Sequence, residues 1–148
     1  MKVLKIPTIE ELKEIDLSYM KTVSQESGVV PQVVIDNELG EPPGVVPYPL
    51  YAHFSTTFDD GVILDIGTLY GSSALALSYN TKNHVKSYDL AEKSKIAQKM
   101  TRENIDWNIM DFREDESIEW DKVKMIVVDT DHTGEQEVEF MKFLIAKD

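Results

Sequence analysis

The first part of the chain has a helical pattern of hydrophobic residues. From Ile9 to Val23 apolar side chains recur every three or four positions, which is typical of a helix with one buried face. Thr8 and Glu11 have the spacing of a capping box, in which a hydroxyl and a carboxylate bind amides at a helix start. The sequence therefore predicts one helix from about residue 8 to about residue 25.

Residues 28–58 lack this regularity. Prolines and glycines are concentrated between residues 28 and 49, which predicts a long loop with one short extended piece at residues 32–35. A short helix is expected at residues 48–58. Because loops of this length often cover binding sites, we expect residues 28–58 to lie over a ligand crevice.

Beyond residue 60, short apolar runs rich in β-branched residues alternate with helical segments. Strands are predicted at residues 62–66, 84–89, 105–110 and 122–129. Helices are predicted at residues 72–80, at 92–102, and from a second capping box at Thr133 to the chain end, with Val138, Met141 and Leu144 or Ile145 on the packed face.

This alternation of strands and helices predicts an α/β fold with a Rossmann-like, mainly parallel sheet. We expect a single domain over residues 1–148. Within it, residues 1–58 would form an N-terminal helix and cover loop, and residues 59–148 a ligand-binding half-sheet.

An aspartate stands at or near the end of each predicted strand, namely Asp65, Asp89, Asp111 and Asp129. In an open parallel sheet, ligands bind in the crevice beyond the carboxyl ends of the strands. Aspartate is also a common turn and N-cap residue. Four such residues at equivalent places favour a shared acidic site over four unrelated turns.

The turn after the first strand, residues 67–73, indicates a nucleoside ligand. Asp89 lies 22 residues after Gly67, close to the ~20 expected for a carboxylate that binds a ribose. A dinucleotide fingerprint requires G-x-G-x-x-G, but Leu69 and Ser72 occupy its second and third glycine positions. A pyrophosphate would also meet the strand-end carboxylates with no Lys or Arg in the turn, so NAD is disfavoured. S-adenosylmethionine, which carries amine and hydroxyl donors and a positive sulfur, suits this site better.

The composition and net charge of the chain exclude several kinds of partner and chemistry. The chain has 15 Lys and Arg against 27 Asp and Glu, a net charge of −12, which disfavours nucleic acid as a partner. The absence of cysteine excludes thiol catalysis and disulfides and fits a reducing compartment. No apolar stretch approaches the ~18 residues of a membrane span. We therefore expect a cytoplasmic protein without a membrane or nucleic-acid partner.

Two segments resemble a known family. The segment from Val62 to Leu77, with Asp-Ile-Gly-Thr followed by Gly-Ser-Ser-Ala, resembles the first motif of class I S-adenosylmethionine-dependent methyltransferases. The segment from Ile126 to Gly134 is similar to the motif after the fourth strand of small-molecule O-methyltransferases in that superfamily. Together they cover roughly residues 50–148. The resemblance implies the strand order 3-2-1-4 and O-methylation of a small hydroxylated acceptor.

The resemblance also implies cofactor contacts along these segments. Asp65 would lie near the ammonium of the cofactor, and Asp89 would accept hydrogen bonds from the two ribose hydroxyls. Asp111 would accept from the adenine amine, although a simple N-cap role is also open for it. Phe112 would cover the ring or serve as ordinary packing. The remaining candidates for cofactor contacts are Gly67, Thr68, Gly71, Ser72, Leu90 and Asp129.

Catalytic candidates follow the fourth strand. His132 is the best-placed general base, because its ordinary pKa lies near neutrality, and Asp131 would share or orient that role. In related O-methyltransferases acidic residues here hold a divalent cation, so Asp129 and Asp131 are candidate ligands for an ion such as Mg²⁺. A polar loop in which Asp131 or Thr133 only caps the last helix is the alternative. His53 and His84 are expected to be structural.

The chain also departs from the family, whose sheet continues beyond a fourth strand. The fourth strand would therefore have an open edge. Three explanations are open: the chain is a truncated part of a longer protein, it forms a homo-oligomer through this edge, or residues 28–49 supply further pairing.

Three functions follow in order of preference. The first is a methyltransferase that acts on a small-molecule acceptor. The second is a non-catalytic module that binds S-adenosylmethionine or another nucleoside, and the third is an NAD-linked enzyme.

Overall fold

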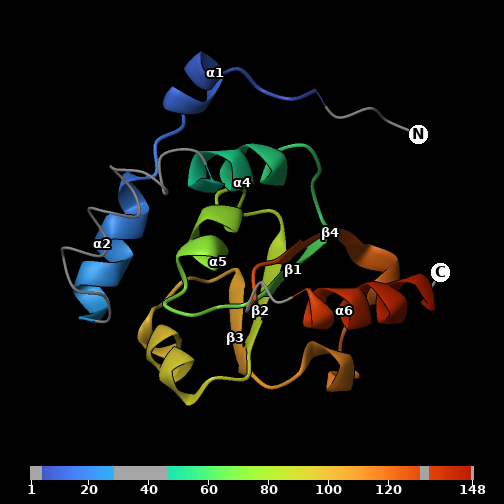
Figure 1. Cartoon of the computed structure of the whole chain (residues 1–148). Coiled ribbons are helices and arrows are strands. Elements are labelled where there is room, and N and C mark those ends of the chain that lie inside the picture. The colour runs from blue at the N-terminus through green and yellow to red at the C-terminus, as the bar shows by residue number, and fades with distance from the viewer. Residues whose placement is uncertain (1–4, 29–46, 131–133, 148) are drawn as a thin grey trace.

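The computed structural model describes residues 5–28, 47–130 and 134–147 (Figure 1). Its centre is a parallel four-stranded sheet with the order β3-β2-β1-β4, as predicted. The strands are β1 (Val62–Ile66), β2 (His84–Asp89), β3 (Ile105–Ile109) and β4 (Val123–Val128). The predicted strands thus agree with the structure to within one residue at either end, and the Rossmann-like α/β class is confirmed.

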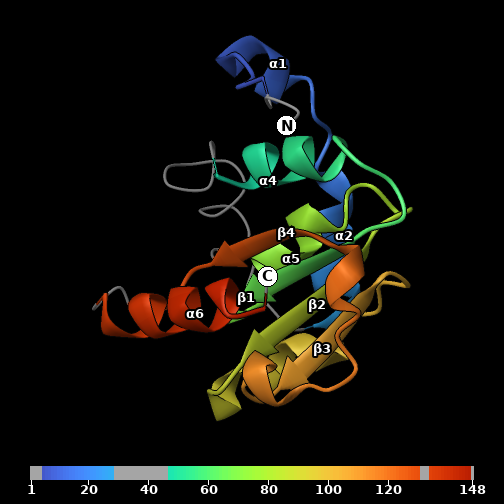
Figure 2. The same cartoon turned by 90° about the vertical axis from the view of Figure 1, so that its right-hand side faces the viewer.

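Helices lie on both faces of this sheet (Figures 1 and 2). One face is covered by α2 (Ser18–Ser27), α5 (Ser72–Leu77) and the 3-10 helix η1 (Glu92–Lys99), with α4 (Pro47–Ser55) packed on α5. The other face is covered by α6 (Glu135–Ile145), η2 (Phe112–Glu114) and η3 (Trp120–Lys122). None of the described helices has the length and apolar character of a membrane span.

Side chains along β1 point alternately to the two faces of the sheet, and this divides the core into two layers. Ile63 faces the α5 layer, whereas Val62, Leu64 and Ile66 face the α6 layer. All five residues of β1 are buried, as expected for a central strand of a parallel sheet covered on both faces. The sheet therefore holds the carboxyl ends of its strands in a fixed row.

The predicted single N-terminal helix is wrong. The structure has two helices, α1 (Ile9–Lys13) and α2, because Asp16 accepts a hydrogen bond from the Ser18 amide at 2.9 Å and forms a local turn between them. The capping box at the start is confirmed, since Thr8 and Glu11 bind each other's backbone amides. The predicted extended piece at residues 32–35 lies outside the described residues.

Two further helices differ from their predicted form. Residues 92–99 form a 3-10 helix instead of part of an α-helix, because Asp89 binds both the Ala91 amide and the Ser94 hydroxyl and ties this segment to the end of β2. α4 ends at Ser55, where the hydroxyls of Ser55, Thr56 and Thr57 bind carbonyls three residues earlier.

The predicted packed face of α6 is also wrong. Val138 and Met141 are each 53% exposed and Ile145 is 69% exposed, whereas Phe140 is 5% exposed. Phe140 and Phe143 bring larger apolar surfaces to the sheet than the aliphatic residues, so burying the aromatic side of the helix is more favourable. Of the residues expected on the packed face, Leu144 alone packs against this core.

The outer edge of β4 is the open edge that the strand order implies. Within the described ranges β4 pairs with β1 alone. The homo-oligomer expected through this edge stays a prediction, and so does truncation. Most of residues 28–49, the third explanation, lie outside the described part of the chain.

Candidate functional site

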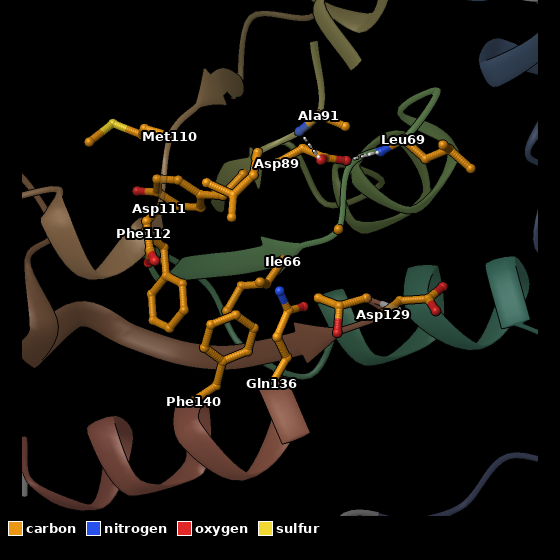
Figure 3. A pocket seen from close by; sticks show the side chains of 14 residues that line it. Ile66, Leu69, Asp89, Ala91, Met110, Asp111, Phe112, Asp129, Gln136 and Phe140 are labelled. Atoms are coloured by element: carbon orange, nitrogen blue, oxygen red, sulfur yellow. Dashed lines mark hydrogen bonds between the residues drawn. The ribbon is translucent and has the colours of Figure 1, made fainter. Parts of the chain in front are cut away.

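A cavity of about 630 Å³ lies at the carboxyl ends of all four strands, on the side of α6 (Figure 3). Each strand end contributes to its wall, and α6 closes the remaining side. Its lining residues are Ile66, Gly67 and Leu69 from β1 and its turn, Tyr88, Asp89, Leu90 and Ala91 from β2, Met110, Asp111 and Phe112 after β3, Asp129 and Thr130 after β4, and Gln136 and Phe140 from α6.

The cavity brings together a majority of the predicted cofactor residues. Those that line it are Gly67, Asp89, Leu90, Asp111, Phe112 and Asp129. The other four are not among its lining residues. Asp65 and Thr68 are buried beneath the turn, Ser72 is the first residue of α5, and the Gly71 backbone packs against Met100 and Trp107.

Asp89 has a carboxylate that already organises the surrounding turns. Its Oδ2 accepts hydrogen bonds from the Leu69 amide at 2.8 Å and the Ser94 hydroxyl at 2.7 Å, and its Oδ1 accepts from the Ala91 amide at 2.7 Å (Figure 3). A carboxylate has about four acceptor positions, so the contacts from the described residues leave one position on Oδ1 for a ligand. Asp89 therefore suits one ribose hydroxyl better than a pair.

Asp111 acts as the N-cap of η2. Its Oδ1 accepts from the Arg113 amide at 2.9 Å, and the Arg113 guanidinium binds both carboxylate oxygens. The hydrogen bonds from Arg113 hold the pKa of Asp111 below its ordinary value. The N-cap alternative is thus confirmed for Asp111, and contact with an adenine amine stays a prediction.

Asp65 is fully buried at 0% exposure and lies behind the turn. Its Oδ2 accepts from Ser87 at 2.7 Å and Ser73 at 3.1 Å, while Oδ1 has no hydrogen-bond partner among the described residues. Burial is the main cause that raises the pKa of Asp65 to about 6, and Asp129 and Asp89 add to the increase. The negative charges of Asp129 and Asp89 therefore make it harder for Asp65 to lose its proton.

Aromatic rings form the apolar wall of the cavity. Phe112 is 1% exposed, and its ring contacts Tyr88, Phe140 and Phe143 at centroid distances of 6.3, 5.1 and 5.6 Å. Ordinary packing is therefore confirmed for Phe112, which also faces the cavity. Leu90, on the rim, is 61% exposed. Because Phe140 is also only 5% exposed, these rings present little free surface to a ligand.

The acidic segment after β3, residues 111–121, is tied to the sheet through Asp115. Asp115 accepts from the Tyr88 hydroxyl at 2.6 Å and from Lys86 at 3.1 Å, and it also binds Ser117. Burial opposes ionisation of Asp115, but the hydrogen bonds from Ser117, Tyr88 and Lys86 outweigh it and lower the pKa. This network anchors Tyr88, whose ring lines the cavity.

The wall from α6 was missed from the sequence. Gln136 and Phe140, one helical turn apart, both face the cavity (Figure 3). Glu137 holds the start of the helix, because its carboxylate accepts from the Thr130 hydroxyl at 3.1 Å and the Gly134 amide at 3.0 Å. The four-residue spacing of Gln136 and Phe140 was the one available signal, but it does not reveal which face meets the sheet.

The catalytic candidates Asp131 and His132 lie outside the described residues. The capping box predicted to start at Thr133 is wrong, because the N-cap of α6 is Gly134 and its amide donates to Glu137. The described segments contain no group of three or more His, Asp or Glu side chains that could hold a metal ion. The cation expected at Asp129 and Asp131 stays a prediction, because Asp131 lies outside the described residues. His84 pairs with Asp106 near the amino ends of β2 and β3, which lie away from the cavity, and His53 packs on Phe54. Both histidines thus agree with the structural roles expected for them.

No protein-family model matches this chain, and no curated protein matches it in sequence.

Proposed function

We propose that the protein binds S-adenosylmethionine in the strand-end cavity and transfers its methyl group to a small hydroxylated acceptor. The supporting observation is the charge of the cavity wall. Asp89, Asp111 and Asp129 line it, and none of its described lining residues is Lys, Arg or His. The ion pair with Arg113 offsets the charge of Asp111, so Asp89 and Asp129 supply most of the negative charge. Such a wall favours a ligand that carries positive charge over one that carries phosphates.

Size and polarity also support this ligand. A cavity of about 630 Å³ falls within the ~300–1,000 Å³ of small-molecule sites. The apolar residues of its wall suit the uncharged part of an adenosyl ligand, and the remaining acceptor position of Asp89 suits a ribose hydroxyl. The ribose and the positively charged sulfur of an adenosyl ligand thus each have a counterpart in the wall.

The cofactor supplies a methyl group on a positively charged sulfur, which a nucleophile displaces directly. The chain then has to hold the two reactants in line and to exclude water, and positioning accounts for most of such a rate increase. The carboxylates attract the charged cofactor more strongly than the neutral product, which favours exchange of product for cofactor. Removal of the acceptor proton is assigned to His132 or Asp131, as the sequence predicts.

Titration calorimetry tests the binding step. We expect S-adenosylmethionine to bind with a submillimolar Kd and more tightly than S-adenosylhomocysteine, with the difference reduced at high salt because charge interactions are screened. NAD and ATP should give no detectable binding, because their phosphates meet the carboxylates. Absence of binding by both sulfur compounds at millimolar concentration would rule out the proposal.

A substitution at Asp89 tests the ribose contact. We expect Asp89→Asn to weaken S-adenosylhomocysteine binding by about tenfold or more, because hydrogen bonds to a charged group are worth ~1.5–3 kcal/mol. Asp106→Asn is the matched control, since its carboxylate binds His84 away from the cavity. Equal affinities of the two variants would contradict the assignment.

Turnover separates an enzyme from a non-catalytic binding module. A methyltransferase should form S-adenosylhomocysteine when given a panel of small hydroxylated compounds, and His132→Ala should reduce the rate without a comparable loss of cofactor affinity. Tight cofactor binding with no product over the whole panel would favour the module.

A further inference from the structure

The turn after β1 holds Leu69 in a backbone conformation that leucine rarely adopts. Its φ is +45°, and among the described residues other than glycine only Asp60 also has a positive φ. Leu69 is the second residue of a turn that the Gly71 amide closes by donating to the Thr68 carbonyl at 2.7 Å. A positive φ at this place of a turn favours glycine, so leucine is strained here.

Core packing does not offset this strain. The Leu69 side chain is 40% exposed and belongs to neither core layer of the described residues, whereas its neighbour Tyr70 packs against the α5 layer. Gly67 and Gly71, which also have positive φ, show that the same turn uses glycine at nearby positions. Strained residues that the core does not require are typical of ligand sites.

Leu69 lines the cavity beside Asp89. Its amide donates to Asp89 Oδ2 at 2.8 Å, and its side chain extends away from that carboxylate (Figure 3). The strand order places the turn after β1 and the end of β4 on one side of Asp89, and the corner after β3 on the other. Arg113 offsets the charge of Asp111 at the β3 corner, whereas Asp129 lines the cavity at the β4 end. A ligand whose ribose binds Asp89 should therefore direct its positive charge toward the side of Leu69.

We propose that Leu69 is a specificity-determining residue whose side chain packs on the aliphatic amino-acid tail that the ligand carries beyond its ribose. The exposed apolar surface of Leu69 is then buried when the ligand binds, which offsets the strain of the turn. This inference rests on the proposed function and specifies how the same site selects its ligand. It predicts that the site distinguishes a nucleoside with such a tail from a nucleoside alone.

The test compares S-adenosylhomocysteine, by titration calorimetry, with adenosine, by ligand-observed NMR. Leu69→Ala removes most of the side chain and should raise the Kd of S-adenosylhomocysteine by about five- to tenfold, the effect of losing part of one buried leucine. The Kd of adenosine should stay within about twofold, because adenosine has no tail. Leu69→Gly should weaken S-adenosylhomocysteine binding equally but raise the urea midpoint of unfolding, because glycine adopts a positive φ without strain.

Asp60→Gly is the matched control. Asp60 is exposed, has φ of +55°, and precedes the amino end of β1, at the opposite end of the strand from the cavity. Its replacement by glycine relieves the same kind of strain and should raise the urea midpoint without changing either Kd.

Opposite changes of stability and affinity in Leu69→Gly distinguish a ligand contact from a structural role, because loss of a structural side chain lowers both. The inference is overturned if Leu69→Ala binds S-adenosylhomocysteine within twofold of the unmodified protein, if adenosine loses as much affinity, or if Leu69→Gly lowers the urea midpoint. In each of these cases the proposed function survives as long as the unmodified protein binds S-adenosylhomocysteine. If the unmodified protein binds neither S-adenosylmethionine nor S-adenosylhomocysteine, the proposed function and this inference both fail.

Discussion

Substituting Gly67 by alanine should lower the free energy of unfolding by about 3–5 kcal/mol and abolish ligand binding. A Cβ at this position would lie 1.9 Å from the backbone oxygen of Asp129 and 2.7 Å from its carbonyl carbon. The obstacle is backbone and cannot rotate away. Gly67 also has φ of +113°, a conformation that side chains rarely adopt.

The predicted effect is large because Gly67 lies where three strands end. Its amide binds the Tyr88 carbonyl at 2.8 Å, and the Asp129 amide binds the Ile66 carbonyl at 2.8 Å. Displacing β4 to relieve the clash would break these contacts and move a carboxylate of the cavity wall. Urea denaturation followed by circular dichroism measures the loss.

Gly28→Ala is the matched control for this substitution. Gly28 also has a positive φ, +62°, but a Cβ there meets no atom within 4 Å. The substitution should lower the free energy of unfolding by about 1 kcal/mol, the penalty for the left-handed conformation alone. Similar losses for the two variants would show that the close approach to Asp129 has no effect.

Replacing Asp65 by asparagine should change how stability depends on pH. Burial raises the pKa of Asp65 to about 6 in the folded protein, whereas the ordinary value for an aspartate is 3.8. The folded state thus holds this proton more tightly than the unfolded state. As the pH rises from about 4 to about 6, the unfolding free energy of the unmodified protein should fall relative to that of Asp65→Asn, by about 3 kcal/mol in total. Above pH 7 the difference should be constant.

The measurement is the difference in unfolding free energy between the two proteins across this pH range. Asp115→Asn provides a control of opposite sign. Because hydrogen bonds lower the pKa of Asp115, its contribution to stability is present at neutral pH and is lost as the pH falls. A pH-independent difference for Asp65→Asn would contradict the prediction that this carboxyl takes up a proton on folding.

Several features of the site could be predicted because they depend on neighbouring residues along the chain. β-Branched runs define the strands, and an aspartate follows the apolar part of each run whatever the strand packs against. Since parallel strands place their carboxyl ends along one edge, the order β3-β2-β1-β4 was enough to bring Asp89, Asp111 and Asp129 to one cavity.

Other features depend on partners that are distant in sequence or on competition between nearby groups. Asp65 and Asp89 both end strands, yet one is fully buried and the other lines the cavity, because Asp65 points to the α5 layer and meets Ser73 and Ser87. The break after α1 depends on an Asp16 turn that competes with a continuous helix. Helical periodicity alone does not resolve such competition.

The sequence by itself determined the α/β class, the strand limits and the presence of an acid at each strand end, since these follow from local backbone preferences and alternation. Only the tertiary structure decided which carboxylates line the cavity and which one is fully buried. It also decided that Phe140 and Gln136, instead of Val138 and Met141, turn inward. Hydrogen-bond saturation and burial are set by the side chains that converge in space, so the pairing of Asp111 with Arg113 and the burial of Asp65 become visible only once the chain is folded.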